Sequence, residues 1–134
     1  MKRSLLMSLL LILLLGSSGC ATSSLKWSAA APGDKSRSGK KVLWHLQGVN
    51  NGIYLFYYIP IVCGHTKRPN RWDYQFFLHW INEKHADRLL RSRLKQLRAA
   101  DVEDVSVEFK SNGWCGLGIF WSRSFTAKGK AVGK

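Results

Sequence analysis

The chain has 134 residues, and 21 Lys and Arg residues against 8 Asp and Glu residues leave a formal net charge of +13. This length suits one core and excludes several independent ones, and six Trp, six Phe and four Tyr residues supply apolar area for it. A strongly positive charge favours polyanionic partners and carries no information about fold. Which polyanion is available depends on where the protein is located.

The first twenty residues have the pattern of an export signal. Lys2 and Arg3 precede an apolar run over residues 5–15, and small residues lead to Gly19. A charged start, an apolar centre and a small-residue end define a secretory signal peptide, and the run is about half of the ~20 residues that a spanning helix needs. We predict a signal peptide over residues 1–19. Export argues against nucleic acid as a partner and leaves anionic lipid, lipopolysaccharide and cell-wall glycan.

Cys20 follows this signal directly. Gly19-Cys20 resembles the lipobox of bacterial lipoproteins, with Ser17 where that motif usually has leucine. The resemblance implies cleavage before Cys20, its acylation and a durable anchor, since several acyl chains hold a protein where one is marginal. Ala21 is not the acidic residue that often retains lipoproteins at the inner membrane, so we expect the outer membrane, with the protein facing the periplasm. The alternatives are a plain secretory signal, which leaves Cys20 as a thiol, and an uncleaved signal anchor.

Residues 20–41 are rich in Ser and Ala and contain Pro32-Gly33 and Gly39, with scattered Lys and Arg. Such a segment buries too little apolar surface to offset the entropy of ordering it. We therefore predict a lipidated, flexible tether. Trp27 is its exception, and it contacts either the lipid interface or, loosely, the domain.

A single domain is expected over residues 42–134, beginning with two strands. Apolar runs at 42–46 and 53–62 flank Asn50-Asn51-Gly52, and Asn-Gly between two β-favouring runs predicts a hairpin. Pro60 has to lie at a strand end, at a bulge or on an edge, because proline cannot donate to the ladder.

A long helix is predicted from about Asp73 to Ala99, capped by Asn70 or Asp73. At 100° per residue its apolar positions form one stripe and its basic positions form the opposite side. The stripe consists of Phe76, Ala86, Leu90, Leu94 and Leu97, and the basic side consists of Lys84, Arg88, Arg91, Lys95 and Arg98.

Two or three strands should follow the helix. Residues 105–109 alternate between apolar and polar, Ser111-Asn112-Gly113 turns the chain, residues 117–125 return it, and residues 127–132 add a short last strand. The predicted fold class is α+β in the order β-β-α-β-β, with one long amphipathic helix packed on a small, mainly antiparallel sheet.

The C-terminal part resembles a known kind of small bacterial domain. A helix that ends in Leu97-Arg98-Ala99-Ala100-Asp101 and a close at Gly129-Lys130-Ala131-Val132 are similar to the heavy-metal-binding-like small proteins and the Rcs-type sensor lipoproteins. In that pattern the helix closes with Leu-Gly-Ala-Asp, so Ala99 stands in place of a glycine. The resemblance implies an α+β fold and names no ligand.

Cys63 and Cys115 are the thiols that remain after Cys20. In an oxidising envelope they predict a disulfide, and the alternative is two buried cysteines too far apart to pair. Cys63-Gly64-His65 has the residues for half of a metal site or for a nucleophile with its base. No second ligand pair at zinc-like spacing follows, and no Ser-His-Asp order is recognisable, so we predict no metal, no cofactor and no catalytic residues.

Two groups of basic residues are candidates for anion binding: the loop at 67–72 and the basic side of the predicted helix. Arginine presents a planar fork that suits phosphate or carboxylate. The candidates are Arg68, Arg71, Arg88, Arg91, Lys95 and Arg98. The alternative is the solvated face that any surface helix shows.

These features together predict a membrane-anchored envelope lipoprotein that is not an enzyme and serves as a structural, interaction or sensor-like module. One alternative is a binding module for anionic lipid, lipopolysaccharide or glycan through the arginine-rich helix face. The other is a redox or metal-binding periplasmic protein that uses Cys63, His65 and Cys115.

Overall fold

The structure is a computed structural model that describes residues 22–71, 73–114 and 119–133. The predicted signal peptide, Cys20 and Cys115 lie outside these residues. Seven elements follow one another in the described part: β1 (Ser23–Ala29), β2 (Val42–Leu55), β3 (Ile59–Gly64), β4 (Tyr74–Phe76), α2 (Glu83–Arg91), β5 (Asp101–Trp114) and β6 (Phe120–Val132).

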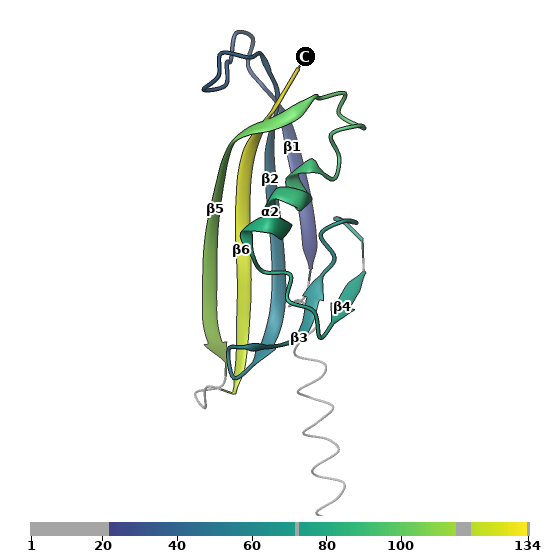
Figure 1. Ribbon diagram of the computed structural model, residues 1–134, viewed down its shortest axis with the longest axis vertical. Helices are drawn as coiled ribbons and strands as arrows, with labels where there is room; N and C mark the ends of the chain where they lie inside the picture. The colour runs from purple at the N-terminus through teal and green to yellow at the C-terminus, as the bar shows by residue number, and fades with distance from the viewer. Residues whose placement is uncertain (1–21, 72, 115–118, 134) are drawn as a thin grey trace, which may run out of the picture.

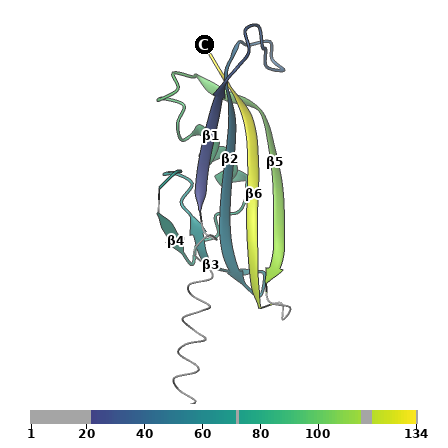
Figure 2. The same ribbon diagram turned by 180° about the vertical axis from the view of Figure 1, so that it is seen from behind.

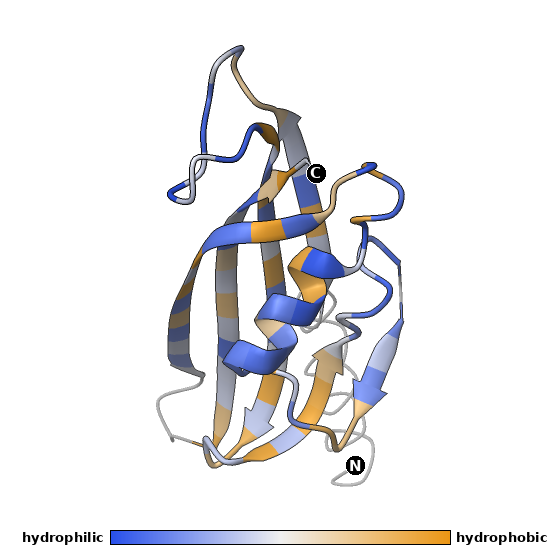
Figure 3. Cartoon of the chain, turned by 45° about the horizontal axis from the view of Figure 1, so that its top comes forward, coloured by the Kyte–Doolittle hydropathy of each residue, from blue (hydrophilic) through white to orange (hydrophobic). Residues whose placement is uncertain are grey.

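The strands form one antiparallel sheet in the order β4-β3-β2-β6-β5, and β1 also pairs with β2 (Figure 1). β2 is central because its whole length pairs with β6, from Val42 opposite Val132 to Leu55 opposite Phe120. The other edge of β2 is shared, since residues 44–50 pair with β1 and residues 52–55 pair with β3. Hydrophobic and hydrophilic residues alternate along the strands (Figure 3), which separates a packed face from an open face.

α2 lies across one face of the sheet, and in the view from behind the strands stand in front of it (Figure 2). Asn82 caps the helix by accepting a hydrogen bond from His85 N, and Ala86, Leu89 and Leu90 are buried. Gly48 on β2 leaves room for this contact, because a Cβ there would lie 2.8 Å from Leu89 Cδ2. The position of the helix thus depends on glycine at position 48, because any larger residue would displace Leu89.

The core fills the layer between α2 and the sheet. Apolar residues of β1, β2, β5 and β6 meet the helix there: Leu25, Leu46, Tyr54, Val102, Phe125, Ala127 and Ala131. Because side chains alternate across a strand, the residues between these positions point to the open face.

The predicted α+β fold with a long helix over residues 73–99 is wrong. Residues 74–76 form β4 on β3, and residues 92–98 form turns after α2 has ended at Arg91. Phe77 and Arg98 have φ angles of 56° and 53°, which a right-handed helix cannot contain. The aromatic residues at the start of this segment favour a pleated, half-buried position, so they extend the sheet. The described part is mainly β with one short helix.

The first part of the predicted tether, residues 23–29, belongs to the sheet instead. Residues 23–29 form β1, and the side chain of Leu25 is 1% exposed. Asn70 binds the outer edge of β1 as a neighbouring strand would: its Oδ1 accepts from Leu25 N at 3.0 Å, and its Nδ2 donates to Leu25 O at 2.9 Å. The folded domain therefore begins well before Val42.

The predicted hairpin at Asn50-Asn51-Gly52 does not form, because β2 runs through these residues and the chain turns at residues 56–58. Gly52 permits a close approach instead, since a Cβ there would lie 2.5 Å from Cys63 Sγ. Pro60 lies opposite Tyr54 beside a register shift, which confirms the bulge among the positions predicted for this proline. After the helix, two long strands replace the two or three short ones.

Candidate functional site

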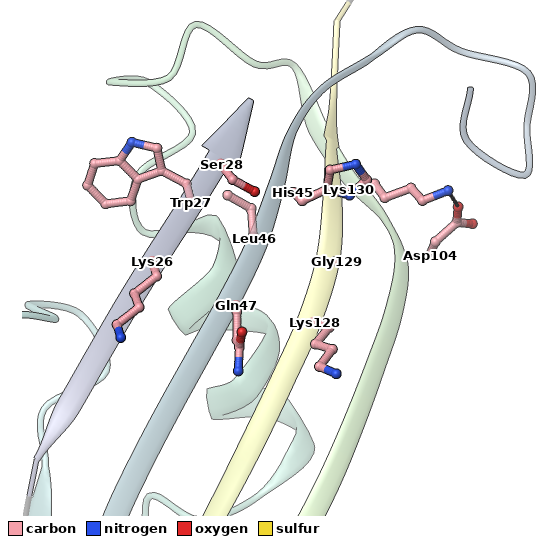
Figure 4. A pocket seen from close by; sticks show the side chains of 10 residues that line it. All are labelled: Lys26, Trp27, Ser28, His45, Leu46, Gln47, Asp104, Lys128, Gly129 and Lys130. Carbon is pink, nitrogen blue, oxygen red and sulfur yellow. Dashed lines mark ion pairs between the residues drawn. The ribbon is translucent and has the colours of Figure 1, made fainter. Parts of the chain in front are cut away.

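The open face of the sheet carries a polar row on three neighbouring strands. Lys26 on β1 pairs with Gln47 on β2, and Gln47 pairs with Lys128 on β6. Each follows directly after a buried core residue of its strand, so each points away from the helix. Figure 4 shows the three side chains next to one another on this face. We call these three residues the lysine row.

The positive charges of the lysine row are not compensated. Within the described part of the chain, neither Lys26 nor Lys128 has a hydrogen bond or an ion pair at its ammonium group. Neighbouring strands lie about 4.8 Å apart, so the two lysine backbones are roughly 10 Å apart. Two exposed cations thus stand on a rigid backbone with a neutral amide between them.

The next row along the same strands differs, because its charges are compensated. His45 pairs with Lys130 across β2 and β6. Lys130 Nζ lies 3.8 Å from Asp34 Oδ1 and 3.4 Å from Asp104 Oδ2, and His45 Nε2 lies 2.9 Å from Asp34 Oδ2. In this second row one lysine faces two carboxylates, so the row adds no excess positive charge beside the lysine row.

The loop that supplies Asp34, residues 30–41, is fastened to the start of β5. Lys40 Nζ donates to Glu103 Oε1 at 2.7 Å, and Ser38 Oγ also donates to Glu103. The bond from Lys40, followed by that from Ser38, lowers the pKa of Glu103 to about 2. Glu103 is therefore ionised at neutral pH, and the contact holds the loop in place there.

A shallow hollow of about 520 Å³ extends over both rows (Figure 4). Ten residues from β1, β2, β5 and β6 line it, with Trp27 at the β1 edge. Lysine ammonium groups and the Gln47 amide offer several hydrogen-bond donors in this hollow. Bonds from a charged donor to an anion are the strong ones, so the arrangement suits an anionic ligand.

A second polar cluster lies on the packed face, where Tyr54 and Cys63 are buried and His79 is exposed. Tyr54 Oη is 2.8 Å from His79 Nδ1, and the Cys63 thiol donates to Tyr54 Oη at 3.5 Å. The Arg123 guanidinium lies over the Tyr54 ring, 4.9 Å from its centre. Burial raises the pKa of Tyr54 and of Cys63 and lowers the pKa of His79, so all three are neutral at pH 7. Since the thiolate is the reactive form of cysteine, this cluster favours a structural role.

The residues predicted for redox or metal chemistry point to different neighbours. Cys63 contacts Tyr54, whereas the His65 ring lies 4.7 Å from the Trp80 ring, between centres, and its Nδ1 accepts from Lys67 N. Cys115 lies outside the described residues, so its disulfide with Cys63 stays a prediction. Within residues 22–71, 73–114 and 119–133, no three His, Cys, Asp or Glu side chains are grouped so that they could hold a metal ion.

The predicted anion-binding residues are spread over three segments. Arg68 and Arg71 lie in the loop before β4, Arg88 and Arg91 lie on α2, and Lys95 and Arg98 lie in the turns after it. Arg91 pairs with Asp87 at 2.9 Å and also with Asp101, and an Arg68 nitrogen lies 3.8 Å from an Asp73 oxygen. One continuous row on one helix face does not exist, because α2 ends at Arg91.

Sequence reasoning missed the lysine row, because it treated the β1 segment as a tether. The signal was present: Leu25, Trp27 and Ala29 alternate with polar residues over residues 23–29, which is the period of a half-buried strand. The partners of Lys26 could not be inferred, because they lie on strands far along the chain.

No protein-family model, no curated protein and no solved structure matches this chain. Among the residues that the structure describes, no helix has the length and apolar character to cross a membrane.

Proposed function

We propose that this protein is a lipid-anchored envelope protein that binds an anionic polymer on the open face of its sheet and has no catalytic role. The lipobox-like signal before Cys20 supports the anchor, and Ala21 favours the periplasmic side of the outer membrane. The observation that carries the binding function is the uncompensated pair Lys26 and Lys128, which flanks Gln47 on neighbouring strands.

Two properties of the lysine row favour a polymer with repeated anionic groups. The backbones of the two lysines are roughly 10 Å apart, which suits two anionic groups better than one. The sheet holds both lysines in register, so the backbone loses little freedom when the ligand binds. A lysine close to an anionic surface contributes on the order of 1 kcal/mol, so the pair supports weak to moderate binding that depends on salt.

The buried cluster around Cys63 supports the non-enzymatic part of the proposal. Its thiol and phenol are neutral because burial raises the pKa of Cys63 and of Tyr54. The arginine-rich face is less favoured as the binding surface than the lysine row, since Arg91 is already paired with two carboxylates.

Titration calorimetry of the purified full chain in detergent at low salt tests the binding function. Polyphosphate and polygalacturonate serve as probes, and they distinguish a phosphate ligand from a carboxylate ligand. The double variant Lys26→Gln/Lys128→Gln should raise the Kd for the preferred probe at least about tenfold, if each lysine contributes on the order of 1 kcal/mol.

The matched control is Lys84→Gln/Lys95→Gln, which removes the same charge from exposed positions on α2 and the turn after it. This control should change the Kd less than about twofold, because only net charge is lost. Equal weakening in both double variants would show that the open face is not a site.

Intact mass of the membrane-extracted protein tests the anchor. We expect a chain that begins at an acylated Cys20, and loss of this form in the Cys20→Ala variant. An unmodified mass would remove the anchor from the proposal and leave the anion-binding face to be judged by the calorimetry alone.

A further inference from the structure

Large apolar side chains are exposed at one end of the sheet, in two adjacent segments. They are Phe56, Tyr58 and Ile59 around the β2–β3 turn and Phe76, Phe77 and Leu78 at the end of β4, and their exposed fractions run from 48% to 78%. The segments are neighbours, because β4 pairs with β3 and Phe77 N donates to Ile61 O at 3.1 Å. Figures 1 and 2 both show the β2–β3 turn and the end of β4 at the same end of the molecule. We call these six residues the apolar end.

The backbone at the apolar end favours different residues from those present. Phe56 and Phe77 have φ angles of 49° and 56°, in the left-handed region where asparagine and glycine are common and bulky residues are rare. Both side chains are mostly in solvent, so core packing does not explain the phenylalanines. Strained positions that persist in a fold often mark a functional surface.

Thr22, the first described residue, lies two residues after the predicted acylation site and close to the β3–β4 pair of the apolar end. Cys20 precedes Thr22 by two residues, which span at most about 7 Å. Thr22 lies against Gly64, since a Cβ on Gly64 would almost touch the Thr22 carbonyl carbon, and Gly64 pairs with Tyr74. Phe76 is two residues further along β4, which is again about 7 Å. An acylated Cys20 can therefore reach the level of Phe76.

We propose that the apolar end inserts into the interface of the bilayer that holds the Cys20 anchor. Aromatic side chains are enriched at membrane interfaces, and apolar faces of surface-bound segments lie about 5–10 Å into the boundary between headgroups and acyl chains. Lys67 and Arg71 are exposed in the loop that joins β3 to β4, at the ends of these strands away from Ile59 and Phe76, so insertion of the apolar end does not depend on their charges.

Insertion of the apolar end fixes the orientation of the domain on the membrane. The strands then run away from the bilayer, and the lysine row on the open face stays accessible to a polymer in the envelope. The inference uses the lipid anchor of the proposed function for its position and is independent of the anionic-polymer site.

Depth-dependent quenching on the lipidated protein tests this inference. The full chain, with Cys115→Ser, is labelled with an environment-sensitive fluorophore at Leu78→Cys or at Val105→Cys and reconstituted in phosphatidylcholine vesicles that contain a spin-labelled lipid. The two sites are similarly exposed, 48% and 41%, and Val105 lies near the other end of β5. Cys63 is buried and should not react with the label.

We expect strong quenching at position 78 and little at position 105. Quenching at 78 should fall severalfold in the variant Phe56→Asn/Phe77→Asn. Asparagine suits the left-handed backbone at both positions, so the fold should be preserved. Circular dichroism checks that it is. Equal quenching at both sites would overturn the inference. Quenching at 78 that requires phosphatidylglycerol would also overturn it, because basic side chains and not the apolar end would then hold the domain on the membrane.

If the intact mass shows no acylation, the unanchored protein is tested by co-sedimentation with the same neutral vesicles. Co-sedimentation that Phe56→Asn/Phe77→Asn removes and Lys26→Gln/Lys128→Gln leaves unchanged would support the apolar end without the anchor. Absence of co-sedimentation would overturn it.

Discussion

Replacing Gly52 by alanine tests whether β2 continues through Asn50-Asn51-Gly52. Gly52 does not have a left-handed φ, and a Cβ there would lie 2.5 Å from Cys63 Sγ, 3.1 Å from Val62 O and 3.2 Å from Tyr54 Cε2. Overpacking of this kind typically costs about 1–3 kcal/mol, so Gly52→Ala should lower the free energy of unfolding by about 2 kcal/mol. The sulfur makes the closest contact, so Cys63→Ala should relieve most of this cost.

A double-mutant cycle measured by urea unfolding, with tryptophan fluorescence as the signal, checks the reasoning. The double variant should be more stable than the two single changes predict, by about 1 kcal/mol or more. If residues 50–52 instead formed a hairpin turn, Gly52 would adopt the positive φ that such turns require, and it would lie away from Cys63. The two changes would then add within about 0.5 kcal/mol, and that result would refute the register of β2 and β3.

Three further predictions concern the helix contact and two titrating groups. Leu89→Ala should lower the free energy of unfolding by about 2–5 kcal/mol, because Leu89 is fully buried against the sheet; urea unfolding measures this, and a loss below 1 kcal/mol would argue against the position of α2. The pKa of Glu103 is lowered from 4.5 to about 2, so its contact with Lys40 stabilises the fold above pH 4.5 and is lost as the pH falls through 2. As the pH falls from 4.5 to 2, the opening of residues 30–41 measured by hydrogen exchange should increase in the native protein. In Glu103→Gln it should not change over the same pH range. Burial lowers the pKa of His79, so its contribution is complete above the ordinary pKa of about 6.5 and decreases below it; His79→Gln should reduce the fall in Tm between pH 7 and pH 5, and an unchanged fall would exclude His79 as its source.

The helix illustrates how far periodicity reaches. The spacing of Ala86 and Leu90 correctly placed one helical face on the core, and both residues are buried. The same period was extended to Phe76, which is in β4 instead. A stripe of apolar residues contains no information on where the backbone leaves the helix. Here α2 spans only Glu83–Arg91, and the φ angles of Phe77 and Arg98 exclude a helix that extends to either residue.

The candidate site was predicted less well than the elements. The cationic surplus was evident from the composition, but the arginines chosen for anion binding depended on a helix that ends at Arg91. The lysine row required β1, which was assigned to a tether because its residues are small and polar on average. Average composition hides an alternation of period two over seven residues, and a short strand of this kind becomes stable only when it pairs with a neighbouring strand.

By itself, the sequence determined the cationic surplus, the alternation that makes residues 105–109 a strand, and the short helical face around Ala86 and Leu90. Tertiary structure alone decided that β1 is a strand, because β2 binds one of its edges and Asn70 binds the other. It also decided that Lys26 and Lys128 share a face. A sheet is held together by partners that are distant along the chain, so the neighbours of a strand residue follow from the register of the whole sheet and not from the residues around it.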